Sequence, residues 1–224
     1  MDFFLFQIFP YIALAFFFLG SILRFDRDPY TWRSKSSQIF RKNQLILGSV
    51  LFHVGILVII LGHAAGLLTP IAVFDAIGIS HGAKQILAIA AGGAAGVLCF
   101  AGLLILIHRR LFDERVRAHT SFADMAVLFL LLGQVSLGLS TIPVSLRHLD
   151  GHEMVKFMNW AQHIVTFRGG ASEFVADVSL VFKLHLTLGM VILLVVPFTR
   201  LVHFFSAPVG FLGRPYQIVR KRSV

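Results

Sequence analysis

The chain has 224 residues, of which 57% are hydrophobic and only 14% are charged. A soluble domain of this length needs more charged residues to cover its surface, so the composition argues against a soluble protein. The formal net charge of +9 would suit a nucleic acid, but the basic residues gather at the ends of apolar stretches. We therefore expect a lipid bilayer around the chain and no nucleic-acid partner.

Five apolar stretches are long enough to cross the hydrocarbon core of a bilayer, which takes about 20 helical residues. They run over residues 3–23, 45–68, 85–107, 121–144 and 178–205. The connections leave no room for a separate soluble domain, so residues 1–224 are predicted to form one all-α domain, an integral membrane five-transmembrane-helix bundle. The first stretch is expected to be a retained membrane helix, because no basic segment precedes it and arginines follow it.

The distribution of Lys and Arg predicts how the bundle is oriented. Six of them lie between residues 24 and 42, one in the next loop, four between residues 109 and 117, and five from Arg200 to the end of the chain. By the positive-inside rule, the basic loops are cytoplasmic. The N-terminus is therefore expected outside, and the C-terminus and the tail 206–224 are expected in the cytoplasm.

The longest connection, residues 145–177, is predicted to contain a helix of its own. Asp150 and Glu153 have the spacing of a capping box, apolar residues then recur at helical spacing, and two glycines end the segment. We expect an amphipathic helix over roughly 151–167, lying on the outer surface of the membrane. An ordinary structured loop is the alternative.

Four of the ten histidines lie inside apolar stretches, and they are the leading candidate functional residues. His53 and His63 belong to the second stretch, and His185 and His203 to the fifth. An imidazole in hydrocarbon must satisfy both of its nitrogens, so an intramembrane histidine is a functional candidate by default. The other six are expected to be solvated or interfacial.

The predicted orientation pairs these histidines between antiparallel helices. His63 and His185 fall near the outer side, and His53 and His203 near the cytoplasmic side. Two facing histidines suit axial ligation of a haem iron, whereas a tetrahedral zinc site needs more ligands at each level. The chain has one cysteine and no Cys-x-x-Cys-His site, so the haems are expected to be non-covalent. Pro197 lies between the two histidines of the fifth stretch and is a possible kink.

Glycines in the second stretch are spaced for close contact along one helix face. Gly48, Gly55 and Gly62 repeat every seven residues, and Gly66 follows. Small residues let another backbone, or a flat ligand, approach a helix closely. The sequence does not decide between these two roles.

Several motifs resemble a known family. They are Tyr30-Thr31-Trp32-Arg33, Leu51-Phe52-His53-Val54-Gly55, Gly62-His63, Arg109-Arg110-Leu111-Phe112, Trp160-Ala161-Gln162, Leu184-His185-Leu186 and Arg200-Leu201-Val202-His203. In order and approximate spacing, the chain resembles the gamma subunit, the cytochrome b subunit, of membrane-bound respiratory nitrate reductase. The resemblance covers nearly the whole chain.

The resemblance implies a function. The chain would be a multi-pass protein of the bacterial cytoplasmic (inner) membrane with two b-type haems, and it would oxidise quinol near the outer haem. Electrons would pass to an iron–sulfur subunit and a molybdenum-containing catalytic subunit on the cytoplasmic face. Nitrate reduction itself would occur on another subunit, so no residue of this chain is expected to be catalytic for nitrate.

Further residues are expected around these groups. Lys84 is the one Lys or Arg of the second loop and lies near the predicted depth of His63, so Lys84, Gly62 and His63 are expected to contact the quinol. A lysine that reaches outward to lipid headgroups is the alternative. Arg110 and Arg200 are expected to contact haem propionates, because a guanidinium matches a carboxylate geometrically.

Two other classes of function remain open at this point. One is a similar cytochrome b of another reductase, such as a heterodisulfide- or sulfite-reductase-like complex, whose partner the sequence cannot reveal. The other is a haem-free transporter or membrane anchor, which predicts carboxylates deep in the spans. The acidic residues nearest to the spans, Asp124 and Asp177, lie near their ends.

The basic tail generates a first prediction. Deleting residues 212–224 removes Arg214, Arg220, Lys221 and Arg222, and opposite charges on a cytoplasmic partner would lose their complement. The deletion is expected to weaken partner association, measured by co-purification of the complex from membranes, and to leave haem content unchanged. Undiminished co-purification would contradict it.

Overall fold

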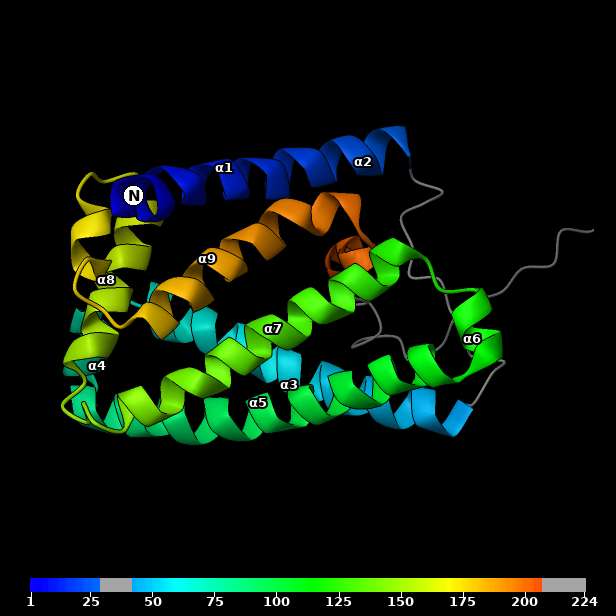
Figure 1. The fold of residues 1–224 in the computed structure, drawn as a ribbon. Coiled ribbons are helices and arrows are strands. Elements are labelled where there is room, and N and C mark those ends of the chain that lie inside the picture. The colour runs from blue at the N-terminus through cyan, green and yellow to red at the C-terminus, as the bar shows by residue number, and fades with distance from the viewer. Residues whose placement is uncertain (29–41, 207–224) are drawn as a thin grey trace, which may run out of the picture.

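The computed structural model describes residues 1–28 and 42–206, and within these ranges the chain is helical with no strand (Figure 1). The stretch Tyr30–Arg33 and nearly all of the expected tail 206–224 lie outside the described residues. The described part contains five helices that are long and apolar enough to cross a membrane: Phe4–Arg27, Lys42–Leu68, His81–Phe112, Phe122–Ser145 and Leu180–Phe198. The prediction of an all-helical protein with five such helices is confirmed.

The first of these helices runs through four consecutive segments. They are η1 (Phe4–Ile8), α1 (Phe9–Ala15), η2 (Phe16–Gly20) and α2 (Ser21–Arg27). The second, third and fourth are α3 (Lys42–Leu68), α5 (His81–Phe112) and α7 (Phe122–Ser145). Shorter helices connect them: α4 (Ile71–Ala76), α6 (Glu114–Ala118), α8 (His152–Val165) and η4 (Ala171–Val175).

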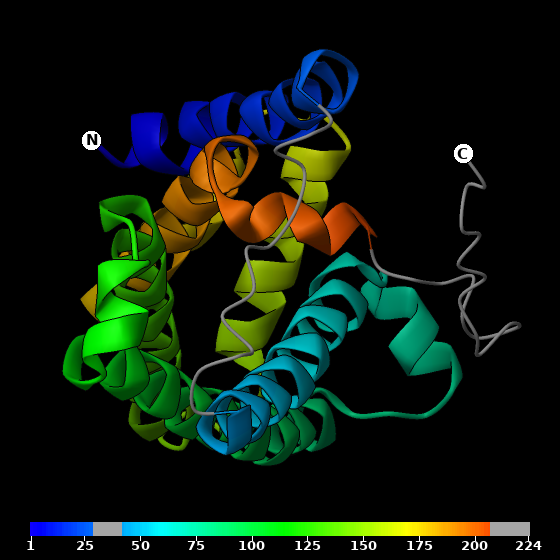
Figure 2. The same cartoon turned by 90° about the vertical axis from the view of Figure 1, so that its right-hand side faces the viewer.

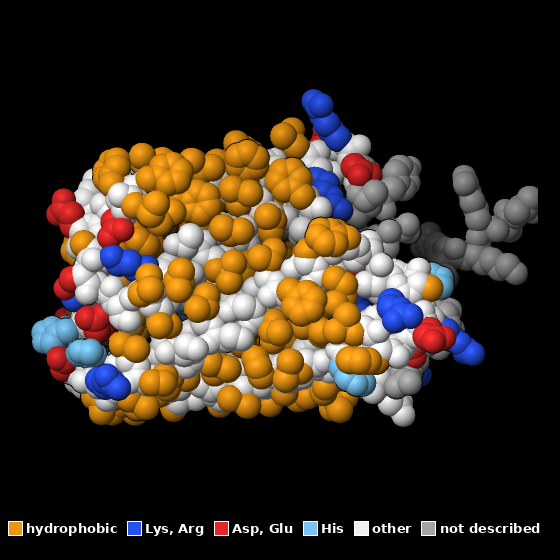
Figure 3. Space-filling view, in the orientation of Figure 1, with side chains coloured by type: hydrophobic (Ala, Val, Ile, Leu, Met, Phe, Trp, Pro, Cys, Tyr) orange, Lys and Arg blue, Asp and Glu red, His pale blue; other side chains and the backbone are white. Residues whose placement is uncertain are grey.

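The long helices pack in sequence around the bundle. α3 packs against α5, α5 against α7, α7 against α9 (Leu180–Val195), and α9 against α1, an order that can be followed in Figure 2. α8 and α4 lie at one end of the bundle, and α6 lies at the other (Figure 1). We call these the α8 end and the α6 end. In Figure 3 apolar side chains cover the length of the bundle and charged ones gather at the two ends, as a bilayer requires.

The fifth helix is broken, not continuous to residue 205 as expected. α9 ends at Val195 and is followed by the short 3-10 segments η5 (Val196–Phe198) and η6 (Arg200–Ser206), with Thr199 extended between them. Pro197 has no N–H to donate, so it cannot continue the α-helical hydrogen-bond ladder, and the chain becomes extended two residues later, at Thr199. The kink foreseen at Pro197 is therefore a complete interruption, and η6 turns across the α6 end toward α3 (Figure 2).

Two starting positions also differ from the sequence expectation. α5 begins four residues earlier than predicted, at His81, because the Ser80 hydroxyl accepts a hydrogen bond from the Ala83 N–H at 3.2 Å. His81 is thus helical and not in a loop. In α8 the capping box of Asp150 and Glu153 does not form: the N-cap is Gly151 at a φ of +82°, a conformation that glycine adopts easily.

α8 ties several elements together at the α8 end. The Trp160 indole N–H donates to Phe6 O at 2.9 Å, and the Gln162 amide donates to Leu67 O and Thr69 O, both at 3.1 Å. The Lys156 ammonium donates to Asp177 Oδ2 at 2.7 Å. This hydrogen bond raises the pKa of Lys156 and lowers the pKa of Asp177. α8 therefore joins the first helix, α3 and the segment before α9.

Glycines allow α3 and α5 to approach each other closely. A Cβ built on Gly55 would lie 2.6 Å from Ala95 O, and one on Gly102 would lie 2.7 Å from Gly48 O. Gly62 and Gly66 differ, because a Cβ there would meet nothing within 4 Å. The glycine series thus divides: Gly48 and Gly55 serve helix packing, and Gly62 and Gly66 face open space.

The same contrast predicts unequal effects for two substitutions on α5. Gly102→Ala places a methyl group against the backbone of α3 and is expected to destabilise the bundle by about 1–3 kcal/mol, as overpacking does. Gly92→Ala, where nothing lies within 4 Å of the added carbon, is expected to be neutral. Thermal unfolding in detergent measures both, and equal midpoints for the two variants would contradict the assignment.

Candidate functional site

The four candidate histidines come together as two pairs, and His203 lies in η6, beyond the spanning helix Leu180–Phe198 in which it was expected. The ring centroids of His63 and His185 are 6.2 Å apart, with an interplanar angle of 45°. The centroids of His53 and His203 are also 6.2 Å apart, with an angle of 64°. α3 supplies one member of each pair, and α9 and η6 supply the other members. These are the pairs expected from the antiparallel arrangement.

Helix carbonyls select the tautomer of three of these rings. Nδ1 of His53 lies 2.7 Å from Ser49 O, and Nδ1 of His63 lies 2.8 Å from Ile59 O. Nδ1 of His203 lies 2.6 Å from Arg200 O. A carbonyl oxygen can only accept, so Nδ1 carries the proton and Nε2 keeps its lone pair. This is the usual arrangement of a histidine that ligates a metal through Nε2.

His185 is positioned differently, by α7. Its Nδ1 is buried without a hydrogen-bond partner among the described residues, and its Nε2 lies 3.5 Å from the amide nitrogen of Gln134. A Cβ on Gly138 would lie 3.0 Å from its Cε1, so the missing side chain makes room for the ring. Sequence reasoning missed Gln134. The rule that singled out the histidines, a polar side chain deep in an apolar span, would have found it.

The two pairs fit a haem iron in distance. An iron bonded to two imidazole nitrogens at about 2 Å each would hold the ring centres about 6 Å apart, close to the 6.2 Å of both pairs. His53 and His63 are exposed, and Gly62 and Gly66 border open space, which suits a flat ring. Within the described residues no three His, Cys, Asp or Glu side chains cluster to form a metal site.

Lys84 points into the protein at the α8 end, and only 7% of it is exposed. Its ammonium donates to Gly66 O at 2.9 Å, lies 2.8 Å from Met158 Sδ, and lies 3.7 Å from the centre of the Phe74 ring. It thus differs from a lysine that extends outward to headgroups. A small cavity of about 10 Å³, lined in part by Lys84, His81 and Phe74, adjoins it.

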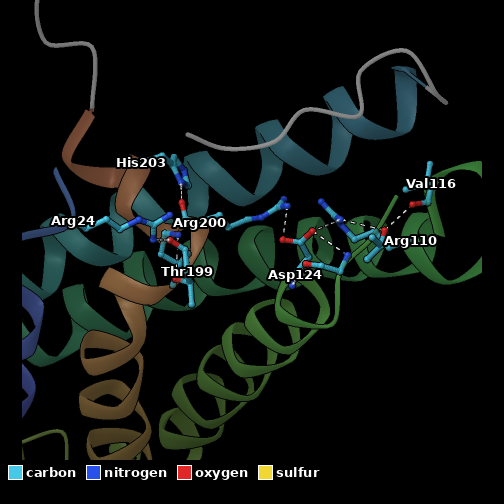
Figure 4. Close-up of polar contacts among 10 residues, drawn as sticks. Arg24, Arg110, Val116, Asp124, Thr199, Arg200 and His203 are labelled. Carbon is cyan, nitrogen blue, oxygen red and sulfur yellow. Dashed lines mark hydrogen bonds and ion pairs between the residues drawn. The ribbon is translucent and has the colours of Figure 1, made fainter. Parts of the chain in front are cut away.

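The two arginines expected near propionates meet at one carboxylate at the α6 end (Figure 4). The Asp124 carboxylate lies 2.5 Å from the Arg200 guanidinium and 3.9 Å from that of Arg110. All three side chains are at most 20% exposed. The Arg200 Nε is buried without a hydrogen-bond partner among the described residues, so it keeps a donor for another group.

The fold and the paired histidines together define a class. The described residues form five apolar spans, and α3 faces α9 and η6 through two histidine pairs, which are the features of a membrane protein that holds haem between helices.

Comparison with known proteins identifies the family. Residues 2–222 match the family model described as nitrate reductase gamma subunit. The respiratory nitrate reductase 1 and 2 gamma chains of Escherichia coli (strain K12) are each 50% identical over 222 residues, covering 99% of this chain and 98% of the relative. The nitrate reductase gamma chain of Bacillus subtilis (strain 168) is 40% identical and covers 98% of both chains.

The chain belongs to the nitrate reductase gamma subunit family. It is a cytochrome b subunit of respiratory nitrate reductase, a multi-subunit oxidoreductase complex, and the resemblance stated from the sequence is confirmed.

Proposed function

We propose that this subunit holds two b-type haems and carries electrons from membrane quinol across the bilayer. The observation that carries the proposal is the presence of two facing histidine pairs, each with 6.2 Å between ring centroids. His63 and His185 would hold one haem at the α8 end, and His53 and His203 the other at the α6 end. When bound, haem supplies one-electron transfer.

The two proposed sites share α3, which fixes their separation. His53 and His63 are ten residues apart on one unbroken helix, which is about 15 Å at 1.5 Å per residue. Because η6 is turned back toward α3, His203 need not lie on the same helical face as His185. The break in the fifth helix thus lets His203 face α3 independently of the direction in which His185 points.

Charge supports the proposed orientation. In the described residues Arg24 and Arg27 close α2, and Arg109, Arg110, Arg115 and Arg117 lie in or near α6. All of these belong to the α6 end, which by the positive-inside rule faces the cytoplasm of a bacterium. The iron–sulfur subunit and the molybdenum-containing catalytic subunit would dock there. The N-terminus would lie on the outer side of the bacterial inner membrane.

Quinol oxidation is proposed at the α8 end, beside His63. Lys84 supplies a buried ammonium that can donate to a quinone oxygen, in place of its bonds to Gly66 O and Met158 Sδ. Gly62 precedes His63 and has open space where a side chain would be, so a ring can approach there. Protons lost by the quinol at this end would leave on the outer side while electrons move inward.

Arg110 and Arg200 are proposed to contact the propionates of the haem held by His53 and His203. Both are held at Asp124, and the unsatisfied Nε of Arg200 is a donor available to a carboxylate. Asp124 compensates part of their charge, so the cluster can be buried without a bound carboxylate.

The alternatives have less support. A cytochrome b of a different reductase fits the histidine pairs equally well, but the match over residues 2–222 is to the nitrate reductase gamma subunit. A haem-free transporter would need carboxylates along a path. Asp124, at the start of α7, is instead bound to Arg200.

The histidine pairs give a prediction with two halves. His63→Ala or His185→Ala is expected to remove the haem at the α8 end and keep the other, because one axial ligand alone does not hold the group in place. His53→Ala or His203→Ala is expected to do the reverse. Redox-resolved visible spectra of the purified complex, with haem quantitation, measure both.

His152→Ala is the control, because His152 is an exposed histidine at the start of α8. It is expected to keep two normal haems. If all four intramembrane variants also kept two spectrally normal haems, the ligand assignment would be wrong.

Lys84→Ala tests the quinol site. The quinol-driven rate is expected to fall by about 10- to 100-fold, the cost of losing a hydrogen bond from a charged donor. The rate with an artificial donor that reduces the complex directly is expected to stay unchanged, with both haems retained. Turnover is measured with each donor in turn.

Lys156→Ala is the matched control, since Lys156 also lies at the α8 end but is paired with Glu153 and Asp177. It is expected to keep the quinol-driven rate. An unaltered quinol-driven rate in Lys84→Ala would remove Lys84 from the site.

A further inference from the structure

The first helix carries none of the paired histidines, yet it contacts the break that precedes His203. The break interrupts the helical hydrogen-bond ladder, so backbone carbonyls beyond α9 need other donors. Arg24, in α2, donates from one guanidinium nitrogen to Pro197 O at 2.7 Å and to Thr199 O at 2.8 Å (Figure 4). One side chain thus binds the residues on both sides of Phe198.

Packing places the same helix face against the same segment. A Cβ on Gly20 would lie 3.0 Å from the Cβ and Cγ atoms of Pro197, so the glycine lets Pro197 approach the helix. The Phe17 and Phe205 rings have centroids 4.9 Å apart. Gly20 and Arg24 are four residues apart and therefore lie on one face. The first helix is in contact with both η5 and η6.

A short chain of hydrogen bonds connects this contact to His203. The Thr199 hydroxyl donates to Val196 O at 3.1 Å and accepts from the Leu201 N–H at 3.2 Å, which starts η6. Arg200 O then accepts from His203 Nδ1 at 2.6 Å. On the other side, Asp124 of α7 holds the Arg200 side chain. The turn that carries His203 is thus held between Arg24 and Asp124.

We propose that Arg24 is a positioning residue for His203, and through it for the group held between His53 and His203. The inference rests on the proposed function, because it assumes that this pair holds a haem. The proposed effect of Arg24 is limited to the pair of His53 and His203. His185 lies twelve residues before Pro197 in the regular helix α9, about 18 Å along the axis, and α7 contacts position its ring.

The test compares Arg24→Met with Arg27→Met in the intact complex. Methionine keeps an unbranched side chain but removes the donors. Arg24→Met is expected to weaken retention of the haem at His53 and His203 by about tenfold, as loss of an outer-shell partner does, and to alter its low-spin EPR signal. The haem at His63 and His185 is expected to be unchanged. Arg27, an exposed arginine of the same helix end, is expected to be replaceable without effect on either haem.

Arg24→Lys is the conservative variant. Its ammonium is compact and cannot span two carbonyls with a guanidinium's geometry, so partial recovery of the altered signal is expected. Normal EPR signals and retention for both haems in Arg24→Met would overturn the proposal. Equal loss of both haems would overturn it too, because Arg24 would then support the whole bundle. His203→Ala separates this outcome from failure of the proposed function, since only the latter predicts that His203→Ala keeps both haems.

Discussion

The burial of imidazole in hydrocarbon is the constraint on which the rest of this structure depends. Both ring nitrogens need a partner there, and a helix can supply only one, through the carbonyl of its preceding turn. His53, His63 and His203 are bound in this way at Nδ1, so the need of Nε2 must be met from across the bundle. α3 and the fifth helical segment are therefore placed with their histidines facing each other, and the other helices support this placement.

The supporting contacts explain the unequal construction of the two ends. At the α8 end, α8 binds the last carbonyls of α3 through Gln162 and the first helix through Trp160, and His185 sits in a regular helix. At the α6 end, the turn that carries His203 lies beyond a proline break and is bound by charged side chains from two other helices, Arg24 and Asp124. Regular helix geometry serves one pair, and long-range polar contacts serve the other.

Features that depend on local composition could be predicted from the sequence. Features that depend on contacts between residues far apart in the sequence could not. Span length and charge were sufficient for five helices, and antiparallel order was sufficient to bring together the histidine pairs. Pro197 signalled a disturbance, but the residues beyond it are bound by Arg24, which is 173 residues away from Pro197 in the sequence. The inward position of Lys84 depends likewise on Gly66 and Met158. The capping box failed because Gly151 at positive φ provides a different start for α8.

The division of each histidine pair between α3 and the last helical segment has a consequence for biogenesis. A ribosome completes α3 when less than a third of the chain has been made, but the facing histidines emerge only with residues 185 and 203. Until then His53 and His63 lack the imidazole rings that face them in the folded bundle. Neither histidine pair can therefore form before most of the chain has been synthesised.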